Sequence, residues 1–212
     1  MTRAATLKKP SRFAPLFHFV HPLALLPLIL LAVDYTRDQL SVNPIQDLTQ
    51  RTGYPAIILL VLSLVCTPLA NITGFKKLLT LRRPLGLYAF GYVVVHMLIF
   101  VVLDFGLDLA LISREVVEKP YVLAGTAALL LLTPLALTST RRAMRALGKN
   151  WKRLHRLVYL AVPLAILHYA WSQKADITQP LILAAIVLVL LVVRLPAVRQ
   201  RLAQRGAASA ER

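Results

Sequence analysis

The chain has 212 residues, of which 58% are hydrophobic and 16% charged, and its formal net charge is +16. This balance excludes an ordinary soluble domain, because the apolar residues are gathered into runs long enough to cross a bilayer. The lysines and arginines lie at the ends of those runs, so membrane topology explains the charge and nucleic-acid binding does not.

Six apolar runs are predicted to be transmembrane helices, because a segment in lipid must satisfy its backbone hydrogen bonds internally. In chain order they are Ala14 to Val33, Tyr54 to Asn71, Pro84 to Leu103, Pro120 to Thr138, Trp151 to Trp171 and Ile177 to Leu195. None has the polar–apolar alternation of a barrel strand. The predicted fold is an all-α membrane protein, a six-transmembrane-helix bundle. It forms one domain over residues 1–212, with basic tails at about 1–13 and 196–212 and no evident internal repeat.

The segments that connect the runs differ in charge. Basic residues dominate both tails and the second and fourth connections, which include Lys76, Lys77, Arg141, Arg142, Arg145 and Lys149. Acidic residues gather in the first and third connections, at Asp34, Asp38, Asp47, Asp104, Asp108, Glu115 and Glu118. By the positive-inside rule, both termini are predicted to be cytoplasmic. The first run lacks a small-residue cleavage pattern, so it is expected to be retained.

Ionisable side chains inside a span are expensive in lipid and usually face a site, so the histidines are the informative residues. His18 and His21 lie on the first run, His96 on the third, and His155 and His168 near opposite ends of the fifth. No Asp or Glu lies deep in a span. The single cysteine, Cys66, excludes an internal disulfide and is interpreted as a packing residue.

His96 and His168 are predicted to lie at the same depth on different helices. Trp151 and Trp171 are roughly 30 Å apart along a helix and would mark the two membrane faces. This places His155 near the cytoplasmic face and His168 near the periplasmic one, in the same half as His96. A haem iron held between two imidazoles needs such a pair on facing helices. The alternative is that each histidine only forms an interhelical hydrogen bond.

His155 and His168 need not serve one cofactor. Thirteen residues along an ideal helix leave them roughly 140° apart around its axis. Pro163 lies between them and cannot donate a backbone hydrogen bond to Tyr159, so a kink there is expected to alter this angle.

Three stretches carry a resemblance to a known family: 82-RRPLGLYAFGYVVVHM-97, 138-TSTRRAMRALGKNWKRLHRLVYL-160 and 163-PLAILHYAWS-172. They resemble the MsrQ (YedZ) family, haem-binding membrane subunits among the ferric-reductase-like transmembrane domains. The resemblance implies a multi-pass protein of the bacterial inner membrane with haem b bound by His96, His155 and His168. It implies electron transfer from the quinol pool or a cytosolic flavin reductase to MsrP, a periplasmic molybdopterin enzyme that repairs methionine sulfoxide.

The chain departs from the wider ferric-reductase pattern of two histidines on each of two helices. Arg83 and Arg82 stand thirteen and fourteen residues before His96, where a second histidine is expected. One haem between His96 and His168 is therefore predicted. The hypothesis for the cytoplasmic side is that His155, with His21 as partner, binds a second haem or a quinone.

Four arginines have two interpretations. These residues are Arg82, Arg83, Arg153 and Arg156. In the first interpretation they neutralise haem propionates or a flavin phosphate, for which the guanidinium fork is suited. In the second they are only positive-inside residues. The resemblance implies FMN as a further cofactor, although no flavin motif is visible. No catalytic residue is predicted, because sulfoxide reduction would occur on MsrP. The alternatives are a histidine-dependent transporter and a non-redox assembly subunit.

Overall fold

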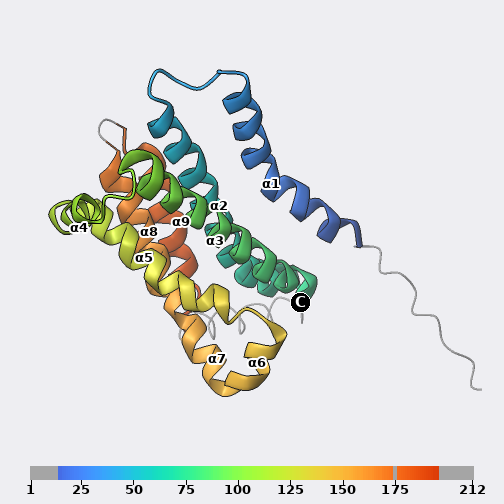
Figure 1. Ribbon diagram of the computed structural model, residues 1–212. Coiled ribbons are helices and arrows are strands. Elements are labelled where there is room, and N and C mark those ends of the chain that lie inside the picture. The colour runs from blue at the N-terminus through green and yellow to red at the C-terminus, as the bar shows by residue number, and fades with distance from the viewer. Residues whose placement is uncertain (1–13, 174–175, 196–212) are drawn as a thin grey trace, which may run out of the picture.

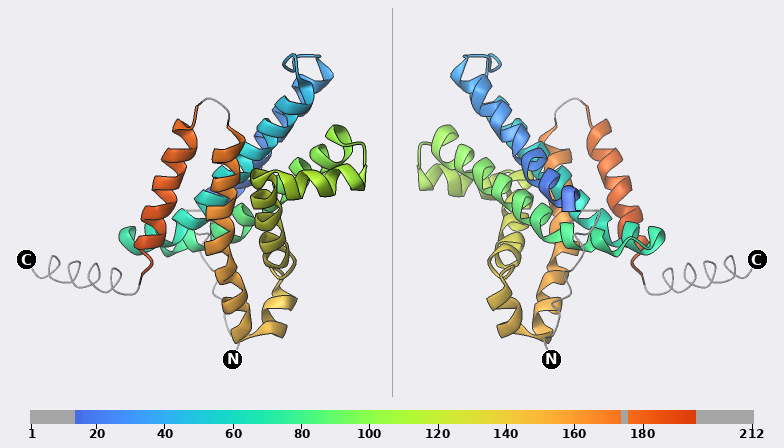
Figure 2. Two further views of the ribbon diagram at one scale, coloured as in Figure 1. Left: turned by 90° about the vertical axis from the view of Figure 1, so that its left-hand side faces the viewer. Right: turned by 90° about the vertical axis from the view of Figure 1, so that its right-hand side faces the viewer.

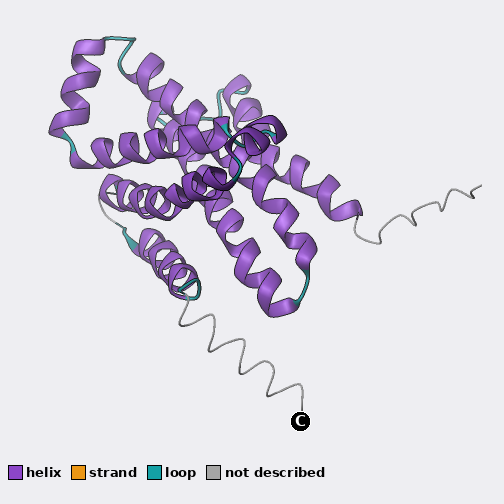
Figure 3. Ribbon diagram, turned by 90° about the horizontal axis from the view of Figure 1, so that it is seen from below, coloured by secondary structure: helices purple, strands orange, loops and turns teal. Residues whose placement is uncertain are grey.

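The structure, a computed structural model, describes residues 14–173 and 176–195, and within these ranges it contains helices and loops but no strand (Figure 3). The longer helices are α1 (Ala14–Thr36), α2 (Pro44–Thr73), α3 (Arg82–Leu98), α5 (Pro120–Leu137), α8 (Val158–Ser172) and α9 (Thr178–Val192). The shorter elements are η1 (Lys76–Leu81), η2 (Ile99–Asp104), α4 (Leu109–Glu118), α6 (Arg141–Leu147), α7 (Lys149–Leu154) and η3 (His155–Leu157). The all-α prediction is thus confirmed for the described residues.

Four helical segments are long and apolar enough to cross a membrane: Phe19–Thr36, Pro44–Thr73, Lys76–Asp104 and Pro120–Leu137. Helix α9 is apolar but has only 15 residues. The predicted fifth span is divided into α7, the 3-10 turn η3 and α8. The membrane character of the fold is therefore supported in the described part of the chain, whereas the count of six spans stays a prediction.

The predicted fifth span changes helix type at a position that the sequence did not indicate, and the kink expected at Pro163 stays a prediction. The helix type changes at His155–Leu157, whereas α8 continues through Pro163. The third span also changes type, because its last six residues, Ile99–Asp104, form a π-helix. Helix α2 begins ten residues before the predicted Tyr54, because the Asn43 side chain accepts a hydrogen bond from the Gln46 N–H and Pro44 suits the first helical position.

The core is built from two helix pairs, α2 with α3 and α5 with α8, which make the most extensive contacts between elements. Figures 1 and 2 show these helices at the centre, with α1 on one side and α9 on another. Ala89 of α3 and Ala161 of α8 are 0% exposed, so one helix of each pair carries a fully buried small side chain. This arrangement fixes the relative positions of the histidines on α3 and α8.

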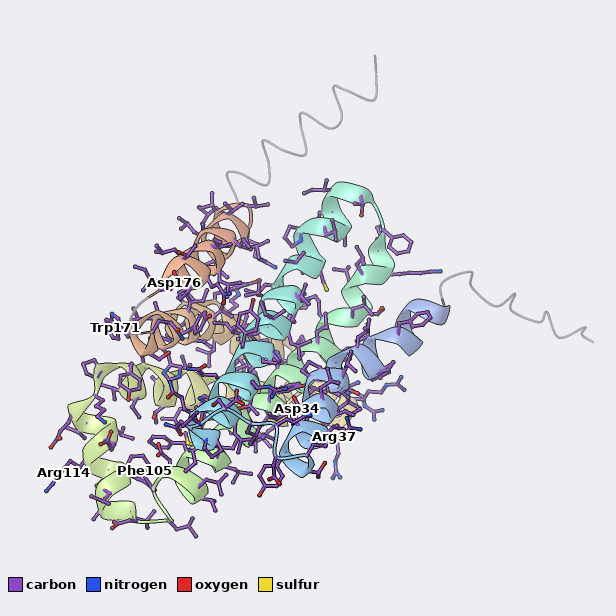
Figure 4. The ribbon with its side chains drawn as sticks, turned by 90° about the horizontal axis from the view of Figure 1, so that it is seen from above. Asp34, Arg37, Phe105, Arg114, Trp171 and Asp176 are labelled. Atoms are coloured by element: carbon purple, nitrogen blue, oxygen red, sulfur yellow. The ribbon has the colours of Figure 1, made fainter. Side chains whose placement is uncertain are left out.

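The two ends of the bundle carry opposite charges. The acidic end comprises the last turn of α1, the first turns of α2 and the segment between them, the segment from η2 to α4, and residues 176–177 before α9. Figure 4 looks onto this end, with Asp34, Arg114 and Asp176 labelled. The basic end comprises η1, α6 and α7 and lies opposite in Figure 2. Within residues 14–173 and 176–195, every Asp and Glu belongs to the acidic end.

Candidate functional site

His96 is held by the first turns of α2. Its ring nitrogen Nδ1 lies 2.9 Å from the backbone carbonyl oxygen of Thr49. Because a carbonyl only accepts hydrogen bonds, Nδ1 must carry the hydrogen and donate it. The other nitrogen, Nε2, is then unprotonated and able to bind a metal.

His168 is held in the same way at the beginning of α5. Its Nδ1 lies 2.7 Å from the backbone carbonyl oxygen of Tyr121, and its ring packs against the Tyr121 ring with centroids 6.1 Å apart. The same reasoning makes Nδ1 the donor and leaves Nε2 unprotonated. A ring nitrogen that donates to a carbonyl while the other nitrogen binds metal is the usual arrangement of a metal-ligating histidine.

The structure brings the two imidazoles together. Their ring centroids are 6.0 Å apart and their planes are nearly perpendicular, at 86°. A metal bound at about 2 Å from each Nε2 would put two imidazole centroids roughly 6 Å apart. The spacing and the protonation of both rings therefore fit an axially ligated haem iron, although the role of His96 and His168 as ligands stays a prediction.

A haem needs only two protein ligands, because the porphyrin supplies the other four. Within residues 14–173 and 176–195, no three His, Cys, Asp or Glu side chains gather where they could hold a metal ion by themselves. A haem between His96 and His168 would lie toward the acidic end, because Thr49 and Tyr121 stand near the starts of α2 and α5.

His155 lies at the basic end and has different neighbours. The Thr138 hydroxyl lies 2.6 Å from the Pro134 carbonyl oxygen, to which it donates, and 3.1 Å from Nε2 of His155. Nε2 is then the protonated nitrogen, which donates to the hydroxyl. Trp151 stacks on the His155 ring with centroids 3.9 Å apart and donates its indole N–H to the Thr138 carbonyl. The free position of His155 is therefore Nδ1.

His155 and His168 are attached to opposite ends of α5. His168 bonds to Tyr121 in its first turn, whereas His155 bonds to Thr138, the residue after its last. The rise of an α-helix separates these anchors by roughly 25 Å. The two histidines therefore cannot bind one iron.

His21 lies beside α3 and not beside His155. Its Nδ1 is 2.8 Å from the Tyr88 hydroxyl, and the two rings meet edge to face with centroids 5.7 Å apart. The contacts of His21 and His155 are thus with other residues, and their pairing in a second site stays a prediction. His18 falls where the structure does not describe side chains.

The four predicted cofactor-binding arginines are all exposed and lie at or next to the basic end: Arg82, Arg83, Arg153 and Arg156. Arg82 is near enough for its charge to act on His155. Since the described residues of this end include no Asp or Glu, the arginines have no carboxylate partner there.

Sequence reasoning missed the residues that hold the imidazoles. The carbonyls of Thr49 and Tyr121 leave no mark in a sequence, because every residue has one. The spacing is the same in both pairs, since each carbonyl stands 47 residues before the histidine that donates a hydrogen bond to it. Thr138, which holds His155, follows an apolar helix and was likewise not singled out.

Comparisons with known proteins bear on this site. Residues 52–166 match the family described as "Ferric reductase like transmembrane component", a stretch that includes His96 and His155. The chain is 44% identical over 208 residues to "Protein-methionine-sulfoxide reductase heme-binding subunit MsrQ" of Rhodospirillum rubrum, covering 97% of this chain and 99% of that protein. It is 42% identical to proteins of the same name from Xanthomonas axonopodis pv. citri, covering 81% of this chain and 82% of that protein, and Ralstonia nicotianae, covering 81% of each.

Proposed function

The chain belongs to the MsrQ family of ferric-reductase-like heme-binding membrane subunits, and on that basis we propose that it is a haem b electron-transfer subunit serving a periplasmic methionine sulfoxide reductase. The observation that carries the proposal is the imidazole pair of His96 and His168, with ring centroids 6.0 Å apart and each Nδ1 committed to a backbone carbonyl. This arrangement leaves two Nε2 atoms to bind one iron.

The residues of the chain hold the cofactor and set its properties. Bound between the two rings, haem supplies one-electron chemistry, with the iron cycling between the ferric and ferrous states. The Thr49 and Tyr121 carbonyls orient the rings and make their Nε2 atoms more basic. His96 and His168 would hold the haem between them and leave it no open position for a substrate, which fits a relay and not a catalytic site.

The charge of the two ends supports an orientation. The positive-inside rule assigns the basic end to the cytoplasm and the acidic end to the periplasm of a bacterial inner membrane. With α8 and α9 as the fifth and sixth spans, both termini are cytoplasmic. A haem held by His96 and His168 would then lie on the side of molybdopterin-containing MsrP, which is the proposed electron acceptor and the place where methionine sulfoxide is reduced.

Entry of electrons is proposed at the basic end. His155 is offered as ligand of a second haem, with its Nδ1 free, and Arg82, Arg83, Arg153 and Arg156 as groups that bind haem propionates or the phosphate of FMN. A quinone is the other proposed donor. An open apolar groove of about 490 Å³, lined by residues of α1, α2, η1 and α3 that include Tyr54 and Cys66, supports the quinone.

The test is the reduced-minus-oxidised absorbance spectrum of the purified protein and of His96→Ala, His168→Ala and His18→Ala. Wild type and His18→Ala should show the bands of low-spin haem b, and the other two variants should lose the share of these bands that belongs to a haem between His96 and His168. If both variants keep full haem and an unchanged spectrum, the ligand assignment is wrong. A colourless wild-type protein would favour the transporter. Lower stability of the variants without any effect on a redox spectrum would favour the assembly subunit.

A further inference from the structure

The two histidine sites are built on the same plan, although no internal repeat was evident in the sequence. The chain repeats three features at an interval of 72 residues: the carbonyl acceptors Thr49 and Tyr121, the glycines Gly53 and Gly125, and the ligand candidates His96 and His168. The first set belongs to the α2–α3 pair and the second to the α5–α8 pair. The interval also relates Ala89 to Ala161, both of which are 0% exposed.

Each glycine stands four residues after the carbonyl that accepts the imidazole hydrogen bond. In an α-helix, the N–H of residue i+4 points at the carbonyl of residue i, and its Cβ is tilted toward the helix N-terminus. A side chain at either position would therefore project over the carbonyl that the imidazole occupies. A carbonyl oxygen has two lone pairs, so it accepts from both the helix N–H and the imidazole.

The space left by each missing Cβ is filled by the imidazole. A Cβ on Gly125 would lie 2.7 Å from Nδ1, 2.9 Å from Cε1 and 3.0 Å from Cγ of His168. A Cβ on Gly53 would lie 3.1 Å from Cε1 and 3.2 Å from Nδ1 of His96. Among the described residues, only these His96 atoms come within 4 Å of the Gly53 position, apart from its own helix backbone and chain neighbours.

These contacts argue against close packing of helix backbones as the reason for the glycines. In membrane helices, glycine often serves to bring two backbones together. Here the atoms nearest to both positions belong to a side chain, which is the imidazole in each case. Alanine would also be the better helix former, so nothing in the helix itself favours glycine.

We propose that Gly53 and Gly125 are positioning residues that seat the two imidazoles, and thereby set how His96 and His168 bind haem. The inference rests on the proposed function, because it presumes iron at the two Nε2 atoms. The two glycine positions differ in how closely the imidazole approaches, since the contact at Gly125 is closer and involves more ring atoms than the contact at Gly53. Alanine at 125 must move the His168 ring off the Tyr121 carbonyl, whereas at 53 a smaller shift of His96 suffices.

The experiment compares Gly125→Ala, Gly53→Ala and Gly91→Ala in purified full-length protein. Gly91 is the matched control, because it lies on α3 with His96 and a Cβ there meets nothing within 4 Å. The measurements are haem bound per chain, the electron paramagnetic resonance spectrum of the ferric haem, and its midpoint potential. Wild type, His96→Ala and His168→Ala are measured alongside.

We expect Gly125→Ala to bind haem about 10- to 100-fold more weakly, as for other losses of a partner that orients a metal ligand. Gly53→Ala should keep haem but shift its resonance spectrum and midpoint potential, while Gly91→Ala matches wild type. If Gly125→Ala does not fold, Gly53→Ala decides, because a purely structural glycine would lower the melting temperature without changing the resonance spectrum.

The outcomes separate this inference from the proposed function. If wild type holds no haem, or if both histidine variants keep it, the proposed function fails. If the histidine variants lose haem but Gly53→Ala and Gly125→Ala both match Gly91→Ala, the function stands and the glycine seats are refuted.

Discussion

The Tyr92 side chain of α3 inserts into the row of backbone hydrogen bonds of α1. Its hydroxyl accepts a hydrogen bond from the Leu28 N–H at 3.0 Å and donates one to the Ala24 carbonyl at 2.8 Å. In a regular helix these two backbone groups would bond to each other. Pro27 removes a further hydrogen bond from the same turn, so both features favour a bend in α1.

We predict that Tyr92→Phe destabilises the protein by an amount on the order of 1 kcal/mol, because it leaves two backbone groups in a buried place without their partner. Thermal unfolding in detergent measures this loss. Tyr35→Phe is the control, since Tyr35 is 61% exposed and Tyr92 is 3% exposed. Equal melting temperatures for the two variants would mean that the Leu28 N–H and the Ala24 carbonyl bond to each other when the hydroxyl is removed.

At the scale of an element, a proline in α2 creates a place for an arginine that follows α9. Pro68 has no N–H, so the carbonyl of Leu64, four residues earlier, lacks its helical partner. The Arg194 guanidinium donates a hydrogen bond to that carbonyl and another to the Leu190 carbonyl, and lies over the Tyr159 ring. This contact ties the end of α9 to α2 and α8.

A double-mutant cycle tests this account. Arg194→Ala should lower stability by about 1.5 to 3 kcal/mol, the usual range for a hydrogen bond to a charged group, and the exposed Arg145→Ala should have little effect. Pro68→Ala restores an N–H that can bond to Leu64, so Arg194→Ala should be less harmful in that background. Losses that simply add would show that the arginine does not act through the Leu64 carbonyl.

The sequence predicted the apolar elements better than their interruptions. Apolar runs locate α1, α5 and α9 within a few residues, because lipid imposes both length and composition. The hydrophobic pattern did not predict the polar first turns of α2, although Asn43 and Pro44 are helix-start signals. The 3-10 turn at His155 could not be predicted, because it depends on where the Thr138 and Trp151 contacts place the chain.

Of the candidate site, only the two candidate ligands were predictable from the sequence. Equal depth on two helices identified His96 and His168, and the structure brings their rings together. The groups that orient the rings are backbone carbonyls and glycines without a side chain. Neither the hydrophobic pattern nor the charge of the sequence indicates such groups. Their regular interval becomes visible only when the contacts of both helix pairs are known.

At the scale of the whole molecule, the separation of charge predicts a single orientation in the membrane. Cys66 is the only cysteine and is 6% exposed, so replacing it with alanine gives a background suited to thiol labelling. In that background, a membrane-impermeant thiol reagent added to intact cells should label Gln39→Cys at the acidic end but not Arg142→Cys at the basic end. After the cells are broken, both should react. Labelling of Arg142→Cys alone in intact cells would reverse the orientation.

Helix α5 contributes no candidate ligand, yet it determines how far apart two of the histidines lie. Tyr121 and Thr138, at its two ends, fix where His168 and His155 stand. Adding one residue between them would lengthen the helix by about 1.5 Å and turn one end by about 100° relative to the other. The distance between the two histidine positions, across which the proposed relay would pass electrons, is thus set by the length of a helix that contributes no candidate ligand.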